Sequence, residues 1–405
     1  GCNTMSAAQV DVLVVGGGMV GVCMALAAAR VGCSVALLEL RPPKPDADHR
    51  DDLRVSAISP SSQRLLANLG IWGSLNATDC CAYEAMSVRD ALGNGRIGFD
   101  CADYAQPSLG HIVFNQAIVS SAWQRVHSAS LISPIEGVGV HAFKRVASHM
   151  SVSLDDGREI DATLVIGADG VNSRVRELAG IRTCGWQYPQ HAVVATVRHA
   201  DPHQRVARQV FLDDGPLAFL PLGDGRSSIV WSTTPRHAEA LTGMAEGEFL
   251  AALEAAMEGE LGAMQQVGAR ASFALGLRHA LDYVQPRLAL IGDAAHQIHP
   301  LAGQGVNLGF VDVAVLSDII KQARQASRDV GEHGILRRYE RRRKSENLPV
   351  MAGMDLIQRL FSRHAEPVNQ IRSLGLSAAD RLTPLKRLFA QQAMGFSGDA
   401  PDLLR

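Results

Sequence analysis

The sequence lacks a strong charge of either sign, a pattern of paired cysteines, and repeated or low-complexity segments. Its 39 basic and 41 acidic residues give a formal net charge of −2 at pH 7, which provides no field for holding a polyanion. This balance excludes nucleic acid as an expected partner. The seven cysteines form no CxxC pair and are odd in number, so we expect free thiols in a reducing compartment.

The chain is long enough for more than one domain. At 405 residues it exceeds the size at which one hydrophobic core stops growing, so about two or three domains are expected. One apolar run, residues 12–29, resembles a membrane span in length. It contains four glycines, follows Asp11 rather than a basic region and ends at Arg30. A buried strand, a turn and a helix explain this run better than a membrane span.

Residues 10–39 predict a strand, a glycine-rich turn, a helix and a second strand, in the order of a βαβ unit. The predicted limits are 10–15 for the first strand, 19–31 for the helix and 34–38 for the second strand.

Three glycines form a GxGxxG motif at the turn of this unit. Gly16 permits the tight turn, Gly18 lets the backbone approach a pyrophosphate, and Gly21 lets the helix pack on the strand. Glu39 ends the second strand, where its carboxylate can accept hydrogen bonds from a ribose. The helix N-terminus then faces the phosphates, so the motif predicts an adenine dinucleotide as the ligand.

A second GxGxxG, formed by Gly93, Gly95 and Gly98, lacks that context. Its Asn94-Gly95 dipeptide is typical of a turn between two strands. We therefore predict a β-hairpin there, and a single nucleotide-binding fold in the chain.

The rest of the chain alternates between helical and strand patterns. The expected elements are a helix 60–69 capped by Ser59, a helix 115–127, a hairpin of 150–154 with 158–167, an antiparallel sheet within 190–232, a buried strand from 287 ending at Asp293, and a long helix from Gln304.

The motifs together resemble a known family. GxGxxG with Glu39, GADG at 167–170 and GDAAH at 292–296 resemble, in this order, the flavin-dependent aromatic hydroxylases typified by p-hydroxybenzoate hydroxylase. HPLAGQGVNLGFVD at 299–312 and RLTPLKRLFAQQAMGFSG at 381–398 are similar to the ubiquinone-biosynthesis hydroxylases within that family. The resemblance covers nearly the whole chain.

The resemblance implies an α/β fold in which a Rossmann-like FAD-binding domain is interleaved with an α+β substrate domain that carries an antiparallel sheet, followed by C-terminal helices. The expected limits are 5–77, 102–182 and 276–330 for the FAD-binding domain, 78–101 and 183–275 for the substrate domain, and 331–405 for the C-terminal helical region.

The resemblance also implies which residues contact FAD. They are Gly16, Gly18, Met19, Val20, Gly21, Glu39, Leu40, Arg54, Asn115, Asp169, Asp293, Pro300, Gly303, Gln304, Gly305, Val306 and Asn307. The motif glycines and Glu39 keep a merely structural turn as their alternative. Three further residues also keep a structural alternative: Arg54 as a surface arginine, Asn115 as the cap of its helix, and Asp169 as the cap of a helix that starts near Asn172.

The late motif admits a metal site as its alternative. Asp293, His296 and His299 are spaced by three residues, whereas helical zinc motifs space their histidines by four, and Pro300 argues against a helix through all three. We expect no metal. On the flavin interpretation, the backbone amides from Gly303 to Val306 open the long helix and lie beside the flavin ring. His296 and His299 are candidate bases, with packing under the flavin as the favoured role.

The resemblance implies an FAD-dependent aromatic-ring monooxygenase that uses NAD(P)H as co-substrate and dioxygen, through a flavin C4a-hydroperoxide, to hydroxylate a polyprenylated phenol in ubiquinone biosynthesis. A hydroxylase of a soluble aromatic compound and a non-catalytic flavin-binding assembly subunit remain alternatives.

The location stays open between the cytoplasm and peripheral contact with the inner membrane or with other ubiquinone-biosynthesis proteins. The basic run 337–344 favours a solvated helix face over a lipid or partner site. Leu385, Leu388 and Phe389 predict a short amphipathic helix that would suit membrane contact.

Overall fold

The computed structural model describes residues 7–44, 52–91, 95–298, 305–361 and 400–405. The predicted amphipathic helix near residue 385 lies outside these ranges.

The first sheet places parallel strands at its centre. Its order is β18-β19-β11-β1-β2-β8, with a β9–β10 hairpin attached to β11. The strands are β1 (Ala8–Val15), β2 (Val35–Glu39), β8 (Ile132–Glu136), β9 (Val140–Arg145), β10 (Met150–Leu154), β11 (Glu159–Gly167), β18 (Val284–Gln285) and β19 (Leu288–Leu290). The buried parts of the inner strands, VLVV in β1, VALL in β2 and LVI in β11, are apolar, as expected where both faces of a strand are covered.

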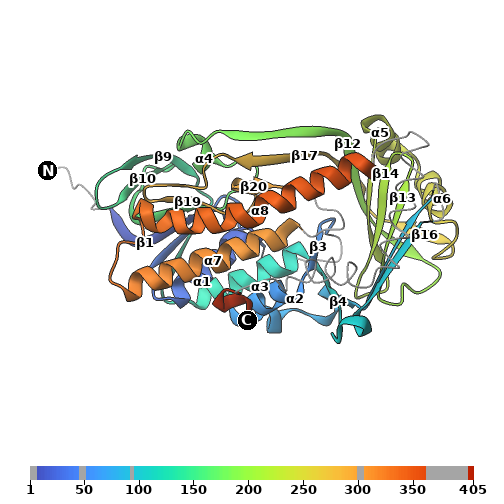
Figure 1. Ribbon diagram of the computed structural model, residues 1–405, viewed down its shortest axis with the longest axis horizontal. Coiled ribbons are helices and arrows are strands. Elements are labelled where there is room, and N and C mark those ends of the chain that lie inside the picture. The colour runs from blue at the N-terminus through green and yellow to red at the C-terminus, as the bar shows by residue number, and fades with distance from the viewer. Residues whose placement is uncertain (1–6, 45–51, 92–94, 299–304, 362–399) are drawn as a thin grey trace.

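Helices cover this sheet. α1 follows β1 directly and packs against α3 and α7, and α7 packs against α8 (Figure 1). The helices are α1 (Met19–Arg30), α2 (Pro60–Asn68), α3 (Asn115–Ser128), α4 (Arg174–Leu178), α5 (Pro235–Gly243), α6 (Glu246–Met257), α7 (Gly305–Gln325) and α8 (His333–Phe361). The apolar run 12–29 thus forms the second half of β1, the turn and most of α1, as predicted.

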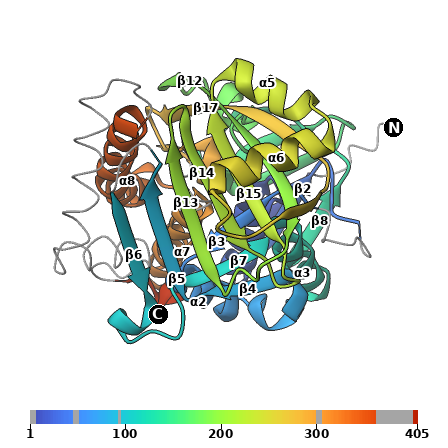
Figure 2. The ribbon, with the colours of Figure 1, turned by 90° about the vertical axis from the view of Figure 1, so that its right-hand side faces the viewer.

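The second sheet lies at the other end of the molecule, with α5 and α6 over one face (Figure 2). Its order is β20-β17-β12-β15-β14-β13-β5-β6, with β16 beside β12. The strands are β5 (Ala85–Asp90), β6 (Arg96–Asp100), β12 (Thr183–His199), β13 (Val206–Leu212), β14 (Gly215–Pro221), β15 (Ser227–Thr233), β16 (Met264–Val267), β17 (Ala271–Ala280) and β20 (His296–Gln297). The pairs are antiparallel except for β13 with β5, which is parallel.

Two features connect the ends of the molecule. The long strands β12 and β17 pair side by side along its length (Figure 1). A small antiparallel sheet of β3 (Val55–Ile58), β7 (Gly110–Phe114) and β4 (Cys80–Tyr83) lies between the two larger ones. The expected fold class is confirmed, as are the β5–β6 and β10–β11 hairpins. The expected domain limits stay a prediction.

The described helices include none that is long and apolar enough to cross a membrane.

Candidate functional site

The three motif glycines occupy different environments at the β1–α1 turn. Gly16 has a φ of +102°, and a Cβ there would lie 2.3 Å from the Ala168 carbonyl oxygen. A Cβ at Gly21 would lie 1.7 Å from the carbonyl oxygen of Gly16. At Gly18, beyond its own helix and chain neighbours, no described atom lies within 4 Å of a Cβ. Packing within the protein therefore requires the first and third glycines but not the second.

The carboxylate of Glu39 lies against this turn. The Gly17 N–H donates to Glu39 Oε2 at 2.6 Å, and Trp123 Nε1 donates to the Gly17 carbonyl at 2.9 Å. A carboxylate keeps further acceptor positions after one such bond, so Glu39 can still accept from a ligand at the end of β2. No local pattern predicts the contact of Trp123, which approaches from α3.

The GADG loop packs directly on the glycine turn, and its aspartate accepts hydrogen bonds from the start of α4. Asp169 Oδ1 accepts from the Ser173 hydroxyl at 2.5 Å, and Oδ2 accepts from the backbone N–H groups of Arg174 and Val175 at 2.8 and 3.2 Å. The N-cap residue of α4 is Ser173, whose hydroxyl accepts from the Arg176 N–H at 3.0 Å. Asp169 is therefore not the cap residue itself, but its carboxylate binds the first N–H groups of this helix. A role of the same carboxylate beside a cofactor stays a prediction.

Asn115 begins α3, but its side chain does not cap the helix. The cap residue is Phe114, which has no side-chain capping bond, and Asn115 Oδ1 accepts from the Ser56 hydroxyl at 2.6 Å. The capping alternative was wrong because the helix starts one residue earlier than a cap at Asn115 requires.

Asp293 and Arg54 lie near one another between the two large sheets. Asp293 is in the 3-10 turn η5 (Gly292–Ala294), directly after β19. Its side chain is exposed, yet the protein around it raises its pKa by desolvation, against the opposing charges of His296 and Arg54. The Arg54 guanidinium lies 5.4 Å from the ring centre of Phe273 in β17.

The first turn of α7 is joined to the segment that carries Arg54. Asn307 Nδ2 donates to the Ala57 carbonyl at 2.8 Å, and Asn307 Oδ1 accepts from the Ser59 N–H at 3.1 Å. Gly305 and Val306 begin the helix beside it. Four expected residues lie outside the described ranges: His299, Pro300, Gly303 and Gln304.

The remaining expected contacts differ in exposure. Val20 packs between Gly292 and Gly309, at which an added Cβ would lie 3.3 and 2.6 Å from its side chain. Met19 is partly buried against the main core, whereas Leu40 is 59% exposed.

His296 is buried beside the Asp312–Arg343 ion pair rather than directed at the surface. Its Nε2 lies 2.5 Å from Asp312 Oδ2, and Arg343 Nε donates to Asp312 Oδ1 at 2.6 Å. His296 is therefore better suited to packing than to proton transfer with a substrate.

The basic run 337–344 is not a uniformly solvated face. Arg343 is only 1% exposed and Tyr339 is fully buried, whereas Arg337, Arg338 and Arg341 are exposed. The prediction of a solvated face was wrong for Arg343. The spacing of Leu336, Tyr339, Arg343 and Asn347 on one helical face could have indicated it.

Arg176 is a further buried cation that sequence reasoning missed. Its guanidinium donates to the Val171 carbonyl at 2.6 Å and to the Ala294 carbonyl at 3.0 Å. It therefore ties the GADG loop to the turn that carries Asp293.

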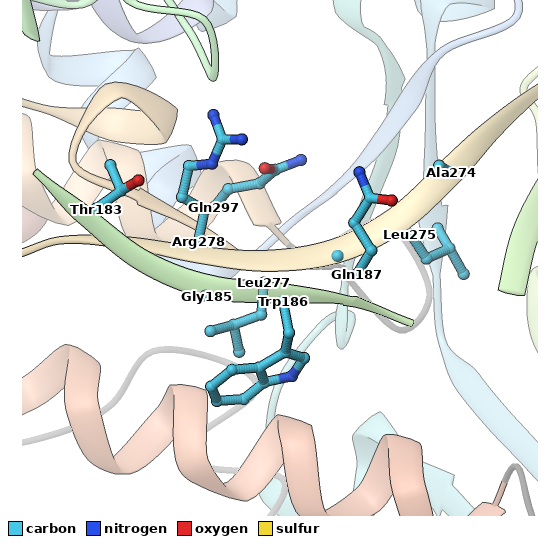
Figure 3. Close-up of a pocket in the computed structure, with 10 residues that line it drawn as sticks. Thr183, Gly185, Trp186, Gln187, Ala274, Leu275, Leu277, Arg278 and Gln297 are labelled. Carbon is cyan, nitrogen blue, oxygen red and sulfur yellow. The ribbon is translucent and has the colours of Figure 1, made fainter. Parts of the chain in front are cut away.

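A cavity of about 260 Å³ lies along the β12–β17 ladder. The side chains of Gln187, Arg278 and Gln297 lie on one side of these strands, and Trp186 and Leu277 point the opposite way, toward α8 (Figure 3). Arg278 Nη1 donates to the Val171 carbonyl at 3.2 Å, so the cavity adjoins the GADG loop.

Solved structures define the class of fold. The structure of p-nitrophenol 4-monooxygenase PnpA from Pseudomonas putida DLL-E4 superposes with a TM-score of 0.77 at 18% identity, covering 96% of this chain and 100% of that one. PqsL, a probable FAD-dependent monooxygenase from Pseudomonas aeruginosa, gives a TM-score of 0.71 at 20% identity, covering 94% of this chain and 100% of that one. The fold is thus that of FAD-dependent monooxygenases.

Sequence comparison gives the family. The model of the FAD binding domain family matches residues 9–351, and the chain belongs to this family. It is 39% identical to the 3-demethoxyubiquinol 3-hydroxylase of Escherichia coli K12, over 95% of this chain and 98% of that protein. It is 39% identical to ubiquinone hydroxylase UbiL of Rhodospirillum rubrum, over 98% and 92%, and 36% identical to human ubiquinone biosynthesis monooxygenase COQ6, over 96% and 92%.

Proposed function

We propose that the protein is an FAD-dependent monooxygenase that uses NAD(P)H and dioxygen to hydroxylate the ring of a polyprenylated phenol in ubiquinone biosynthesis. The observation that carries the proposal is the meeting of three motifs at the ends of β1, β11 and β19, which are neighbours in one sheet. In an open α/β sheet, ligands bind outside the carboxyl ends of the parallel strands. Similarity over nearly the full length of quinone hydroxylases supports the same function.

The residues at these strand ends fit FAD. The open position at Gly18 lies at the N-terminus of α1, where the first N–H groups have no acceptor within the helix and favour a pyrophosphate. Glu39 supplies a carboxylate for ribose hydroxyls at the end of β2. Asp293 would accept from the ribityl chain, and the start of α7 would place backbone donors and a partial positive charge beside the flavin ring.

Bound FAD supplies the redox chemistry, taking a hydride from NAD(P)H and activating dioxygen. The protein's part is to hold the two ring systems together and to exclude water. Only one dinucleotide fold was expected from the sequence, which suits a co-substrate that binds briefly. Arg278 and the neighbouring glutamines give the cavity a polar side suited to a charged co-substrate.

One face of the second sheet suits an aromatic substrate. Val193 packs in the core beneath α5 and α6, and Val194, the next residue, faces the opposite way. Val194 pairs with Val230 and Ala271, and Phe273 shares their face. We place the substrate ring against these apolar side chains, near Arg54 and its contact with Phe273.

The polyprenyl tail and the site of attachment in the cell belong to the same proposal. A substrate with a long apolar chain resides in a lipid bilayer, so the protein would contact the membrane surface peripherally. The exposed arginines of α8 supply positive charge for such a contact.

The test is a hydroxylation assay with oxygen-18 gas. The purified FAD-loaded protein, with NAD(P)H and a short-chain polyprenylated phenol, should form a product that contains one labelled oxygen by mass spectrometry. Labelling of only an unprenylated phenol would support the soluble-aromatic alternative. Failure of NAD(P)H to reduce the flavin anaerobically would support a non-catalytic subunit.

A further inference from the structure

A single carboxylate oxygen holds both ends of the turn that contains Asp293. Asp312 Oδ2 accepts from the Gly292 N–H at 2.8 Å and lies 2.5 Å from His296 Nε2. The turn is closed by the Ala295 N–H, which donates to the Gly292 carbonyl at 3.0 Å. Asp293 lies between these fixed ends with its own side chain exposed.

Asp312 is itself held by a buried cation from α8. Asp312 is 0% exposed and Arg343 is 1% exposed, with Arg343 Nε donating to Asp312 Oδ1 at 2.6 Å. Arg343 Nη2 also donates to Asn347 Oδ1 at 2.7 Å, within the same helix. Burial raises the pKa of Asp312, but His296 and Arg343 outweigh this effect and keep the pKa below its usual value.

A contribution to the free energy of folding does not by itself explain this buried ion pair. Buried ion pairs are often replaceable by apolar side chains without loss of stability, because desolvation offsets the attraction. Here the two oxygens of Asp312 have separate partners: Oδ1 meets Arg343, and Oδ2 meets both ends of the turn. The pairing therefore keeps Oδ2 in one position as an acceptor.

We propose that Asp312, held by Arg343, is a positioning residue that fixes the Asp293 turn in the shape that binds FAD. This inference rests on the proposed function, in which Asp293 accepts from the flavin ribityl chain. Asp312 acts through the turn and does not contact the cofactor itself. A preorganised turn binds more tightly because less conformational freedom is lost on binding.

Two double variants separate the role of Asp312 as a hydrogen-bond acceptor from the role of its charge. Asp312→Asn with Arg343→Met removes the buried carboxylate and guanidinium together but keeps an amide oxygen that can accept at both ends of the turn. Asp312→Leu with Arg343→Met removes the same carboxylate and guanidinium and also removes the acceptor. We expect the Asn/Met protein to bind FAD within about threefold of the wild type, and the Leu/Met protein to bind at least roughly tenfold more weakly, since hydrogen bonds to two ends of the turn are lost.

The measurement is the FAD dissociation constant of each apoprotein by flavin fluorescence, well below its melting temperature. Arg338→Met is the matched control, because Arg338 is an exposed arginine of the same helix, and it should bind FAD normally. Adding Asp293→Ala to the Leu/Met protein should cause little further loss, since both changes act on one contact. Equal affinities of the two double variants would overturn the proposal, and so would a fully additive loss on adding Asp293→Ala.

Two further variants keep the result interpretable. If the Leu/Met protein does not fold, His296→Leu can be used instead. It removes the contact of Asp312 Oδ2 with His296, at one end of the Asp293 turn, and keeps the Asp312–Arg343 pair. It should weaken FAD binding severalfold, and unchanged affinity would refute the inference. Asp293→Ala alone tests the proposed function: if it leaves FAD affinity unchanged, the flavin contact fails, whereas a loss there without a loss in the Leu/Met protein removes only this inference.

Discussion

At the scale of single residues, the glycine turn separates positions that the protein needs from a position that a ligand would need. Gly16 and Gly21 have carbonyl oxygens where a side chain would be. Gly18 has an ordinary φ of −71° and open space around it. A requirement for glycine at Gly18 would therefore arise from the cofactor.

Gly18→Val should abolish FAD retention while the protein remains folded. The valine side chain would occupy the space proposed for the pyrophosphate, and its cost to the free energy of unfolding should be about 1 kcal/mol, as for a poor helix cap. The ratio of flavin to protein absorbance and the melting temperature of the apoprotein measure the two effects. Gly16→Val is the contrasting variant and should destabilise the fold itself. Normal FAD content in Gly18→Val would contradict the site.

Asp293→Asn should weaken FAD binding and yet stabilise the apoprotein at neutral pH. Desolvation raises the pKa of Asp293 in the folded state, so the folded protein binds more protons than the unfolded chain, and stability falls as the pH rises through this interval. The asparagine variant avoids that loss, so its melting temperature should exceed that of the wild type at pH 7. The difference should shrink as the pH approaches 4, and a melting temperature below the wild type's at pH 7 would contradict this.

For individual helices and strands, local sequence patterns predicted the limits of the element but not its distant contacts. The predicted helix 19–31 and the predicted strand 34–38 match α1 and β2 to within a residue, because glycine punctuation and apolar periodicity lie within each segment. The partners of Asp312 could not be predicted in this way, because Arg343 lies 31 residues further along the chain. The basic composition of residues 337–344 predicted a solvent-exposed helix face. The side chain of Arg343 is instead buried between α7 and its own helix.

In the candidate site too, the sequence predicted the motif residues but not their contacts with distant parts of the chain. The turn glycines, Glu39 and Asp293 follow from spacing and from the resemblance, and the structure brings their strand ends together. Neighbours in space decide whether a carboxylate binds the start of a helix or stays exposed. Asp169 accepts hydrogen bonds from the first N–H groups of α4, whereas Asp293 is exposed. Their roles toward FAD remain predictions.

α8 is an element that contacts both large sheets, and Asp355 fastens its C-terminal half. Trp186 Nε1 and the Tyr188 hydroxyl donate to Asp355 Oδ1 at 3.0 and 2.5 Å, and Arg359 Nε donates to Oδ2 at 2.9 Å. Partial burial raises the pKa of Asp355, but these hydrogen bonds outweigh it and keep the pKa below its usual value.

Asp355→Ala should lower the free energy of unfolding by about 1–2 kcal/mol, since hydrogen bonds to a charged group are lost. The wild type's advantage should be complete above the unfolded pKa of an aspartate, about 4, and should disappear as the pH falls through the lower folded pKa. Urea unfolding at several pH values measures this. Hydrogen exchange should quicken in residues 350–361 and not in 335–345. Arg328→Ala, which breaks an exposed pair with Glu332, is the control and should change little.

At the scale of the whole molecule, the last described residues return to the first sheet's helices. The 3-10 turn η7 (Asp402–Leu404) packs against α2 and α7. Leu403 and Leu404 are 2% and 6% exposed, and Arg64 Nε donates to the Leu404 carbonyl at 2.7 Å. These contacts join the two helices whose first turns are linked through Asn307.

Deletion of residues 402–405 should destabilise the protein by about 2–4 kcal/mol, because two leucine side chains would lose their buried contacts. Thermal unfolding of the apoprotein measures the change. Arg405→Ala, at the exposed end of the same segment, should stay within about 0.5 kcal/mol of the wild type. A deletion variant as stable as the wild type would show that this segment does not hold α2 and α7 together.

A crystal structure of the protein with FAD would show whether one cofactor binds at the ends of β1, β11 and β19. We expect the pyrophosphate beside Gly18 at the start of α1, a ribose on Glu39, the ribityl chain on Asp293 and the flavin ring beside the start of α7. FAD bound elsewhere, or protein side chains filling the space beside Gly18 in the FAD-soaked crystal, would refute this assignment.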